Sequence, residues 1–144
     1  MTDSDTISLL KECNSGIKMG ISSLDDVMEH VHASDLKKVL QKAKREHEKL
    51  GDETHDILLK YHEEGKEPHP MAKMMSVMKT STKIAMDESD RAIAELLTDG
   101  CDMGIKSLHK YLNRYKSAQE EVRSLTGRII DSEENLRRDI QGYL

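Results

Sequence analysis

The chain has 144 residues, of which 34% are charged and 36% hydrophobic, with a formal net charge of −5. This length fits one domain with its own core, and the few prolines among many charged residues are typical of amphipathic helices. Phe and Trp are absent, so we expect a core of Leu, Ile, Val and Met and no deep aromatic ligand pocket. The acidic balance disfavours nucleic acid as a partner, and no apolar run is long enough to cross a membrane.

The first part of the chain predicts a helical hairpin at about 5–63. Apolar residues recur three and four apart, as in a coiled-coil seam, and Asn14 fills the one gap. The seam comprises Ile7, Leu10, Ile17, Ile21, Leu24, Met28 and Val31. After a short turn, where Ser34 is a candidate N-cap, a second stripe follows. It comprises Leu36, Leu40, Ala43, His47, Leu50, Thr54, Ile57 and Tyr61. The short loop predicts that these two helices run antiparallel.

A crossover is predicted at about 64–86, because Gly65, Pro68 and Pro70 interrupt the helical pattern. Within it four methionines at helical spacing predict a short extra helix that lies across the bundle. These methionines are Met71, Met74, Met75 and Met78. Such a stripe favours plastic packing, and it is also a candidate partner-binding surface, since Met-rich faces adapt to several ligands.

A second hairpin is predicted at about 87–143, with one helix to about Tyr115 and another from about Ser117. The inward residues of its first helix are Ile93, Leu97, Cys101, Gly104, Leu108, Tyr111 and Tyr115. Those of its second helix are Val122, Leu125, Ile129, Ser132, Leu136 and Ile140. The whole chain, 1–144, is therefore expected to form one all-α domain.

The two predicted hairpins share an internal echo. Cys13-Asn14-Ser15-Gly16-Ile17-Lys18 returns as Cys101-Asp102-Met103-Gly104-Ile105-Lys106, which indicates two copies of one unit. Together with the order of hairpin, long crossover and hairpin, this echo resembles the ferritin-like superfamily, and it is most similar to an uncharacterised bacterial family of ferritin-like proteins. The resemblance implies an antiparallel four-helix bundle with a short extra helix in the crossover.

The resemblance also implies where metal ligands would stand. Iron-handling ferritin-like proteins place a Glu on each of two helices and a Glu-x-x-His on each of the other two. Here the corresponding first-helix positions hold Asn14 and Asp102, and the pattern Asp52-x-x-His55 falls on the wrong face of the second helix. The last helix contains no histidine. We therefore expect that the usual di-iron centre is lost and that the protein has no cofactor.

One inward polar residue, His47, leaves an alternative open. A buried imidazole needs hydrogen-bond partners, which Asn14 or a nearby carboxylate could supply. The same imidazole could instead join carboxylates in a single-metal site of the kind that iron or zinc accepts. The candidate ligand set is His47, Glu46, Glu53, Asp102 and Glu133.

Catalysis by a nucleophile is not predicted. Cys13 and Cys101 have no histidine three or four residues away that would lower their pKa, so both are expected to be free buried thiols. Gly16 and Gly104 are expected to permit close helix approach, which would compensate their cost of about 1 kcal/mol in helix propensity.

The sequence thus favours a non-catalytic binding protein of the cytoplasm that acts through a protein partner or through self-association. The alternative is a metal-binding ferritin-like protein, with a storage or redox-stress role and a non-standard ligand set.

Overall fold

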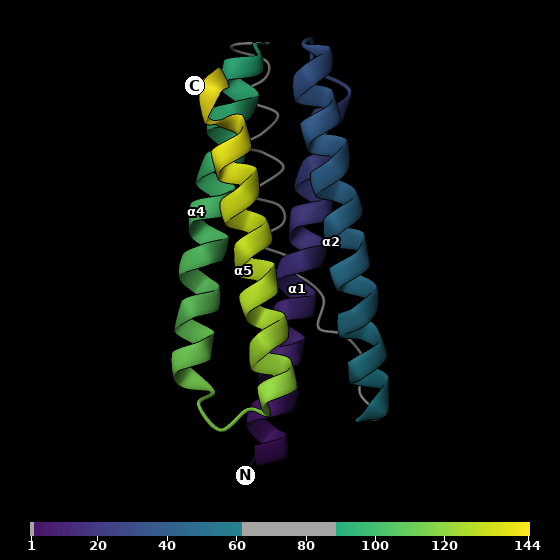
Figure 1. Ribbon diagram of the computed structural model, residues 1–144, viewed down its shortest axis with the longest axis vertical. Helices are drawn as coiled ribbons and strands as arrows, with labels where there is room; N and C mark the ends of the chain where they lie inside the picture. The colour runs from purple at the N-terminus through teal and green to yellow at the C-terminus, as the bar shows by residue number, and fades with distance from the viewer. Residues whose placement is uncertain (1, 62–88) are drawn as a thin grey trace.

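A computed structural model describes residues 2–61 and 89–144 as a bundle of four long helices (Figure 1). The helices are α1 (Thr2–Met28), α2 (Ser34–Lys60), α4 (Asp90–Arg114) and α5 (Glu120–Ile140), followed by the short 3-10 helix η1 (Gln141–Tyr143). These residues contain no strand, and the predicted all-α four-helix fold is confirmed. The predicted extra helix, with Met71, Met74, Met75 and Met78, lies outside the described residues.

Contacts between named residues give the helix directions. Gly20 of α1 lies against His47 of α2, and Asp25 pairs with Lys44, so α2 runs back along α1. Along α1 and α5, by contrast, Thr6 bonds to Gln119 and Cys13 to Thr126, which means that these two helices run the same way. As Figure 1 shows, α2 ends at one end of the bundle and α4 begins at the opposite end.

Each hairpin loop is held by the other hairpin. The carboxylate of Asp90, in the first turn of α4, accepts hydrogen bonds from the backbone N–H groups of His32 and Ala33 at 2.8 and 2.9 Å. These bonds explain why the predicted Ser34 cap is wrong. Ala33 is the N-cap of α2 and makes no side-chain cap bond, and a carboxylate from another helix binds the loop instead.

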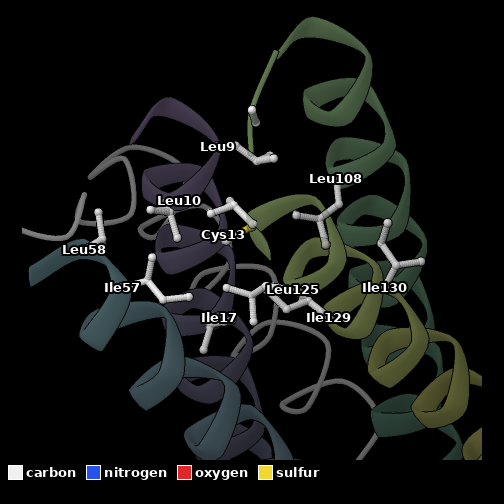
Figure 2. Close-up of a cluster of buried hydrophobic side chains, with 12 residues drawn as sticks. Leu9, Leu10, Cys13, Ile17, Ile57, Leu58, Leu108, Leu125, Ile129 and Ile130 are labelled. Carbon is white, nitrogen blue, oxygen red and sulfur yellow. The ribbon is translucent and has the colours of Figure 1, made fainter. Parts of the chain in front are cut away.

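The core divides into two apolar clusters along the bundle. The first, drawn in Figure 2, consists of Leu9, Leu10, Cys13, Ile17, Ile57, Leu58, Leu108, Ala118, Val122, Leu125, Ile129 and Ile130. The second consists of Leu24, Val27, Leu36, Leu40, Ala43, Ile93, Leu97, Cys101, Leu136 and Ile140. Full burial of a Leu or Ile side chain stabilises the fold by about 1.5–3 kcal/mol, so these clusters supply most of the driving force.

The seam predicted for the first helix is buried in part, and its buried face is wider than predicted. Leu10, Ile17 and Leu24 are buried as expected, but Thr6 and Leu9 are fully buried as well. The reason is that α1 packs against α2, α4 and α5, whereas a two-helix seam covers only one narrow stripe.

Candidate functional site

A polar layer separates the two apolar clusters. We call Gly20 of α1, His47 of α2, Gly104 of α4 and Glu133 of α5 the central layer. In α2 it falls between Ala43 of the second cluster and Ile57 of the first, and in α5 between Ile130 of the first cluster and Leu136 of the second. Every long helix therefore contributes one residue to the layer.

His47 and Glu133 face each other across this layer. His47 Nε2 lies 2.7 Å from Glu133 Oε1, and the two side chains are only 2% and 13% exposed. The other ring nitrogen, Nδ1, lies 2.8 Å from the carbonyl oxygen of Ala43, one turn earlier in α2. Both ring nitrogens of the imidazole are thus engaged.

The hydrogen-bond partners of His47 indicate where its protons lie. A carbonyl oxygen only accepts, so His47 Nδ1 carries a proton and donates it to Ala43. A second proton must then lie between Nε2 and Glu133 Oε1, because two lone pairs at that distance would repel. Burial pushes the pKa of His47 down, but the hydrogen bond and charge of Glu133, the Ala43 carbonyl and the charge of Glu46 together raise it above its ordinary value. The raised pKa favours the doubly protonated ring, which donates from Nε2 to the Glu133 carboxylate in a charge-assisted hydrogen bond.

Gly20 makes room for the imidazole. A Cβ atom at this position would lie 2.9 Å from His47 Cδ2 and 3.1 Å from Nε2, closer than such atoms pack. A Cβ at Gly104 would lie 3.7 Å from the Glu133 carboxyl group, which is ordinary contact. The prediction for Gly16 is wrong, because this residue is exposed and a Cβ there would meet nothing within 4 Å. The close approach is at Gly20, one turn further along α1.

The two cysteines are free and buried, as predicted. Cys13 lies in the first cluster, with its Sγ 3.2 Å from Thr126 Oγ1, and burial raises its pKa to about 11. Cys101 lies in the second cluster, where burial and the charge and hydrogen bond of Glu133 raise its pKa. Both groups are therefore protonated thiols at neutral pH, a state that is unreactive as a nucleophile.

The structure brings together only part of the candidate metal set. His47 and Glu133 are in contact, and Glu46 lies at the edge of the layer, where it accepts a 3.4 Å hydrogen bond from Ser132. Glu53 and Asp102 lie outside the central layer, and each forms an ion pair with an arginine. The carboxylate of Glu53 accepts hydrogen bonds from both terminal guanidinium nitrogens of Arg128, at 2.6 and 2.8 Å. Asp102 accepts one from Arg137 at 2.8 Å. Across residues 2–61 and 89–144, no three His, Cys, Asp or Glu side chains are grouped so as to hold a metal ion.

A pocket of about 270 Å³ opens between α2 and α5, next to the central layer. Its lining mixes both charges with apolar side chains: Val39, Lys42, Ala43, Glu46, Asn135, Leu136, Arg138 and Asp139. Sequence reasoning missed this pocket because it is formed by the partly exposed edges of two helices, which show no distinctive pattern. It missed Gly20 as well, since six glycines lie in the four long helices and only the structure tells which one faces a bulky ring.

No protein-family model matches this sequence, and no similar protein was found among curated sequences. The fold is similar to the crystal structure of a DUF305 fragment from Deinococcus radiodurans, with a TM-score of 0.75 over 96% of this chain and 93% of that chain. The two sequences are 14% identical over this match, so the likeness shows the fold alone. Within the described part of the chain, no helix is both long and apolar enough to span a membrane.

Proposed function

We propose that this chain is a ferritin-like bundle that acts by binding and not by catalysis, with an acid–base pair at its centre in place of a metal ion. The observation that carries the proposal is the contact between His47 and Glu133. The imidazole uses both nitrogens within the protein, on Glu133 and on the Ala43 carbonyl. Two further carboxylates of the candidate ligand set, Glu53 and Asp102, are engaged by arginines.

The connection between the hairpins supports the ferritin-like part of the proposal. Asp90 binds the loop that precedes α2, so α4 starts beside the beginning of α2 and far from its end. The chain therefore crosses from one end of the bundle to the other between the end of α2 and the start of α4. A single long crossover of this kind distinguishes ferritin-like bundles from simple up-and-down ones.

We propose a protein partner or a second copy of the chain as the ligand, with Met71, Met74, Met75 and Met78 as the contact surface. Two free thiols fit a reducing compartment, which supports a cytoplasmic location. The raised pKa values of both thiols support a role without covalent catalysis.

The first test is metal content, measured by plasma mass spectrometry on protein purified without a histidine tag, followed by titration with iron(II), zinc and manganese. Metal-free protein that binds none of these ions in the titration supports the proposal. The alternative is a metal protein, which the adjacency of His47 and Glu133 would favour. Stoichiometric metal in the native protein that is lost in a His47→Ala variant would replace the proposal by this alternative.

The proposed contact surface is tested by mild oxidation with hydrogen peroxide, followed residue by residue with mass spectrometry. Met103 is an internal standard, because its side chain is 67% exposed. If the four methionines form a docking surface, they should become sulfoxides at a rate close to that of Met103. Protection of all four in the isolated protein would remove the surface from the proposal.

A further inference from the structure

The two hairpins are equivalent halves of the bundle. His47 in α2 and Glu133 in α5 are 86 residues apart, and so are Glu46 and Ser132, the second pair in contact between these helices. On the other two helices, Gly20 lies beside His47 and Gly104 lies beside Glu133. The contacts therefore define a twofold pseudo-axis that passes between α2 and α5 at the central layer.

Two further observations fit the same relation. Asn14 Nδ2 and Thr98 Oγ1, the buried side-chain atoms without a hydrogen-bond partner in the described residues, are as far apart in the chain as Gly20 and Gly104. The two hairpin loops also make equivalent contacts. Asp90 accepts a hydrogen bond from the backbone of Ala33, the N-cap of α2, and Thr6 accepts one from the backbone of Gln119, the N-cap of α5. The structural repeat differs by one helical turn from the Cys-x-x-Gly echo in the sequence.

Equivalent halves raise a problem of specificity. Where two surfaces have the same shape, a hairpin of one molecule can pair with the like hairpin of another as well as with its own partner. At the pseudo-axis, pairing of like hairpins would place His47 against a second His47, or Glu133 against a second Glu133. Like charges that share a buried site disfavour each other strongly, whereas the unlike pair forms a charge-assisted hydrogen bond.

We propose that His47 and Glu133 are the specificity residues of the α2–α5 interface. They make the first hairpin pair with the second hairpin of the same chain in a single register. They thereby exclude pairing of a hairpin with the same hairpin of a second copy of the chain. A shift of one turn along α5 would move His47 toward the buried Ile129 or toward Arg137, and neither offers its Nε2 proton an acceptor. Buried polar groups act in this way in helical assemblies, where they select register and partner at some cost in stability.

The decisive test replaces both residues by leucine in the full-length protein. The variant His47→Leu/Glu133→Leu replaces the polar pair by two apolar side chains at the α2–α5 contact, so it should fold at least as stably as the native protein. Loss of selection should raise the fraction of two-copy or slipped species by about tenfold or more. Analytical ultracentrifugation measures the copies, and a doubling of amide peaks in NMR spectra reports slipped forms. A folded variant with the same species distribution and peak count as the native protein would overturn the proposal.

A second test exchanges the two residues. In His47→Glu/Glu133→His the imidazole would lie beside Gly104, and its Nδ1 could donate to the Ile129 carbonyl one turn earlier, as in the native arrangement at Ala43. Each single change brings two like groups together and should lower the melting temperature by about 10 °C. The exchanged pair should recover most of that loss and keep the native species distribution. If it melts no higher than the worse single variant, the halves are not equivalent and the proposal fails.

The control is an exchange on the same two helices outside the core. Glu53 and Arg128 are 39% and 49% exposed and form an ion pair between α2 and α5. The variant Glu53→Arg/Arg128→Glu, and either single change, should leave the number of species unchanged. This control separates selection at the buried pseudo-axis from a general effect of charge on the α2–α5 contact.

Discussion

His47 and Glu133 occupy matching positions in the two hairpins, but their surroundings differ. The imidazole is 2% exposed and has no room to spare against Gly20, where a Cβ would lie 2.9 Å away. The carboxylate is 13% exposed, and a Cβ at Gly104 would lie 3.7 Å from it, which is an ordinary contact. The hairpin that carries the base is therefore fixed by shape as well as by charge, whereas the hairpin that carries the acid is fixed mainly by charge.

The largest expected effect comes from removing one member of the pair. His47→Leu leaves the Glu133 carboxylate nearly buried without its counter-charge and should lower the free energy of unfolding by about 3–5 kcal/mol. Glu133→Leu leaves the buried imidazole of His47 without its carboxylate partner, but the imidazole can lose its proton and become neutral. The free energy of unfolding should therefore fall by only about 1–3 kcal/mol. Urea denaturation measures both values. Equal losses in the two variants would contradict the asymmetry between the hairpins.

A smaller effect separates the two glycines. Gly20→Ala places a methyl group against a ring that is held by two hydrogen bonds and cannot turn away. We expect a net loss of about 1–2 kcal/mol, since overpacking outweighs the gain in helix propensity. Gly104→Ala should be neutral or gain up to about 1 kcal/mol, because the added Cβ meets only ordinary contacts.

Gly16→Ala is the matched control for this pair, since it lies on α1 one turn before Gly20 and in open space. It should gain up to about 1 kcal/mol in thermal or urea unfolding. A Gly20→Ala variant as stable as Gly16→Ala would show that the close contact with the imidazole has no energetic weight.

The pair should also make stability depend on pH. The pKa of His47 is raised in the folded protein, so folding takes up a proton at this site. The contribution is complete below the unfolded pKa of about 6.5 and is lost as the pH rises through the higher folded-state pKa. Urea unfolding between about pH 6 and pH 9 measures the slope, and His47→Gln should remove this part of it. The same slope in both proteins would assign the dependence to other groups.

The sequence predicts much of the fold because helix periodicity is local. The apolar spacing around Leu10, Ile17 and Leu24 marks a buried face, and those residues are buried. Helix ends are harder to predict when distant residues decide them. Ser34 has the right chemistry for a cap, but the loop before α2 is bound by Asp90 instead. Because Asp90 is distant in the sequence, no local pattern predicts this contact.

The candidate site was predicted less completely for a related reason. His47 and Glu133 are both among the predicted residues, and His47 is the more conspicuous because an inward imidazole interrupts an apolar stripe. Whether a carboxylate meets that imidazole or an arginine depends on helix rotation to within a fraction of a turn, and no local pattern encodes it. The echo misleads for a related reason. It aligns Cys13 with Cys101, whereas loop lengths and packing make the structurally equivalent residues differ from that alignment by one helical turn.

The smallest expected effect concerns the hairpin loops, which are also held by unequal contacts at the two ends of the bundle. Asp90 accepts two backbone hydrogen bonds, from His32 and Ala33, whereas Asp5 accepts one at 3.0 Å, from Ser117. Each such bond contributes about 0.5–1.5 kcal/mol, and solvent can replace it in part because these contacts are largely exposed. We therefore expect Asp90→Ala to lower the free energy of unfolding by about 1 kcal/mol, and Asp5→Ala by about half as much.

Hydrogen exchange gives the sharper measurement of this difference, since it reports each loop separately. In Asp90→Ala the amides of His32 and Ala33 should exchange faster while that of Ser117 is unchanged, and Asp5→Ala should show the reverse. Asp131→Ala, an exposed change on α5, is the control for the general effect of losing a carboxylate. If both loops loosened together in either variant, the two ends of the bundle would be coupled through the central layer, and the hairpins could not be treated as halves held independently at their loops.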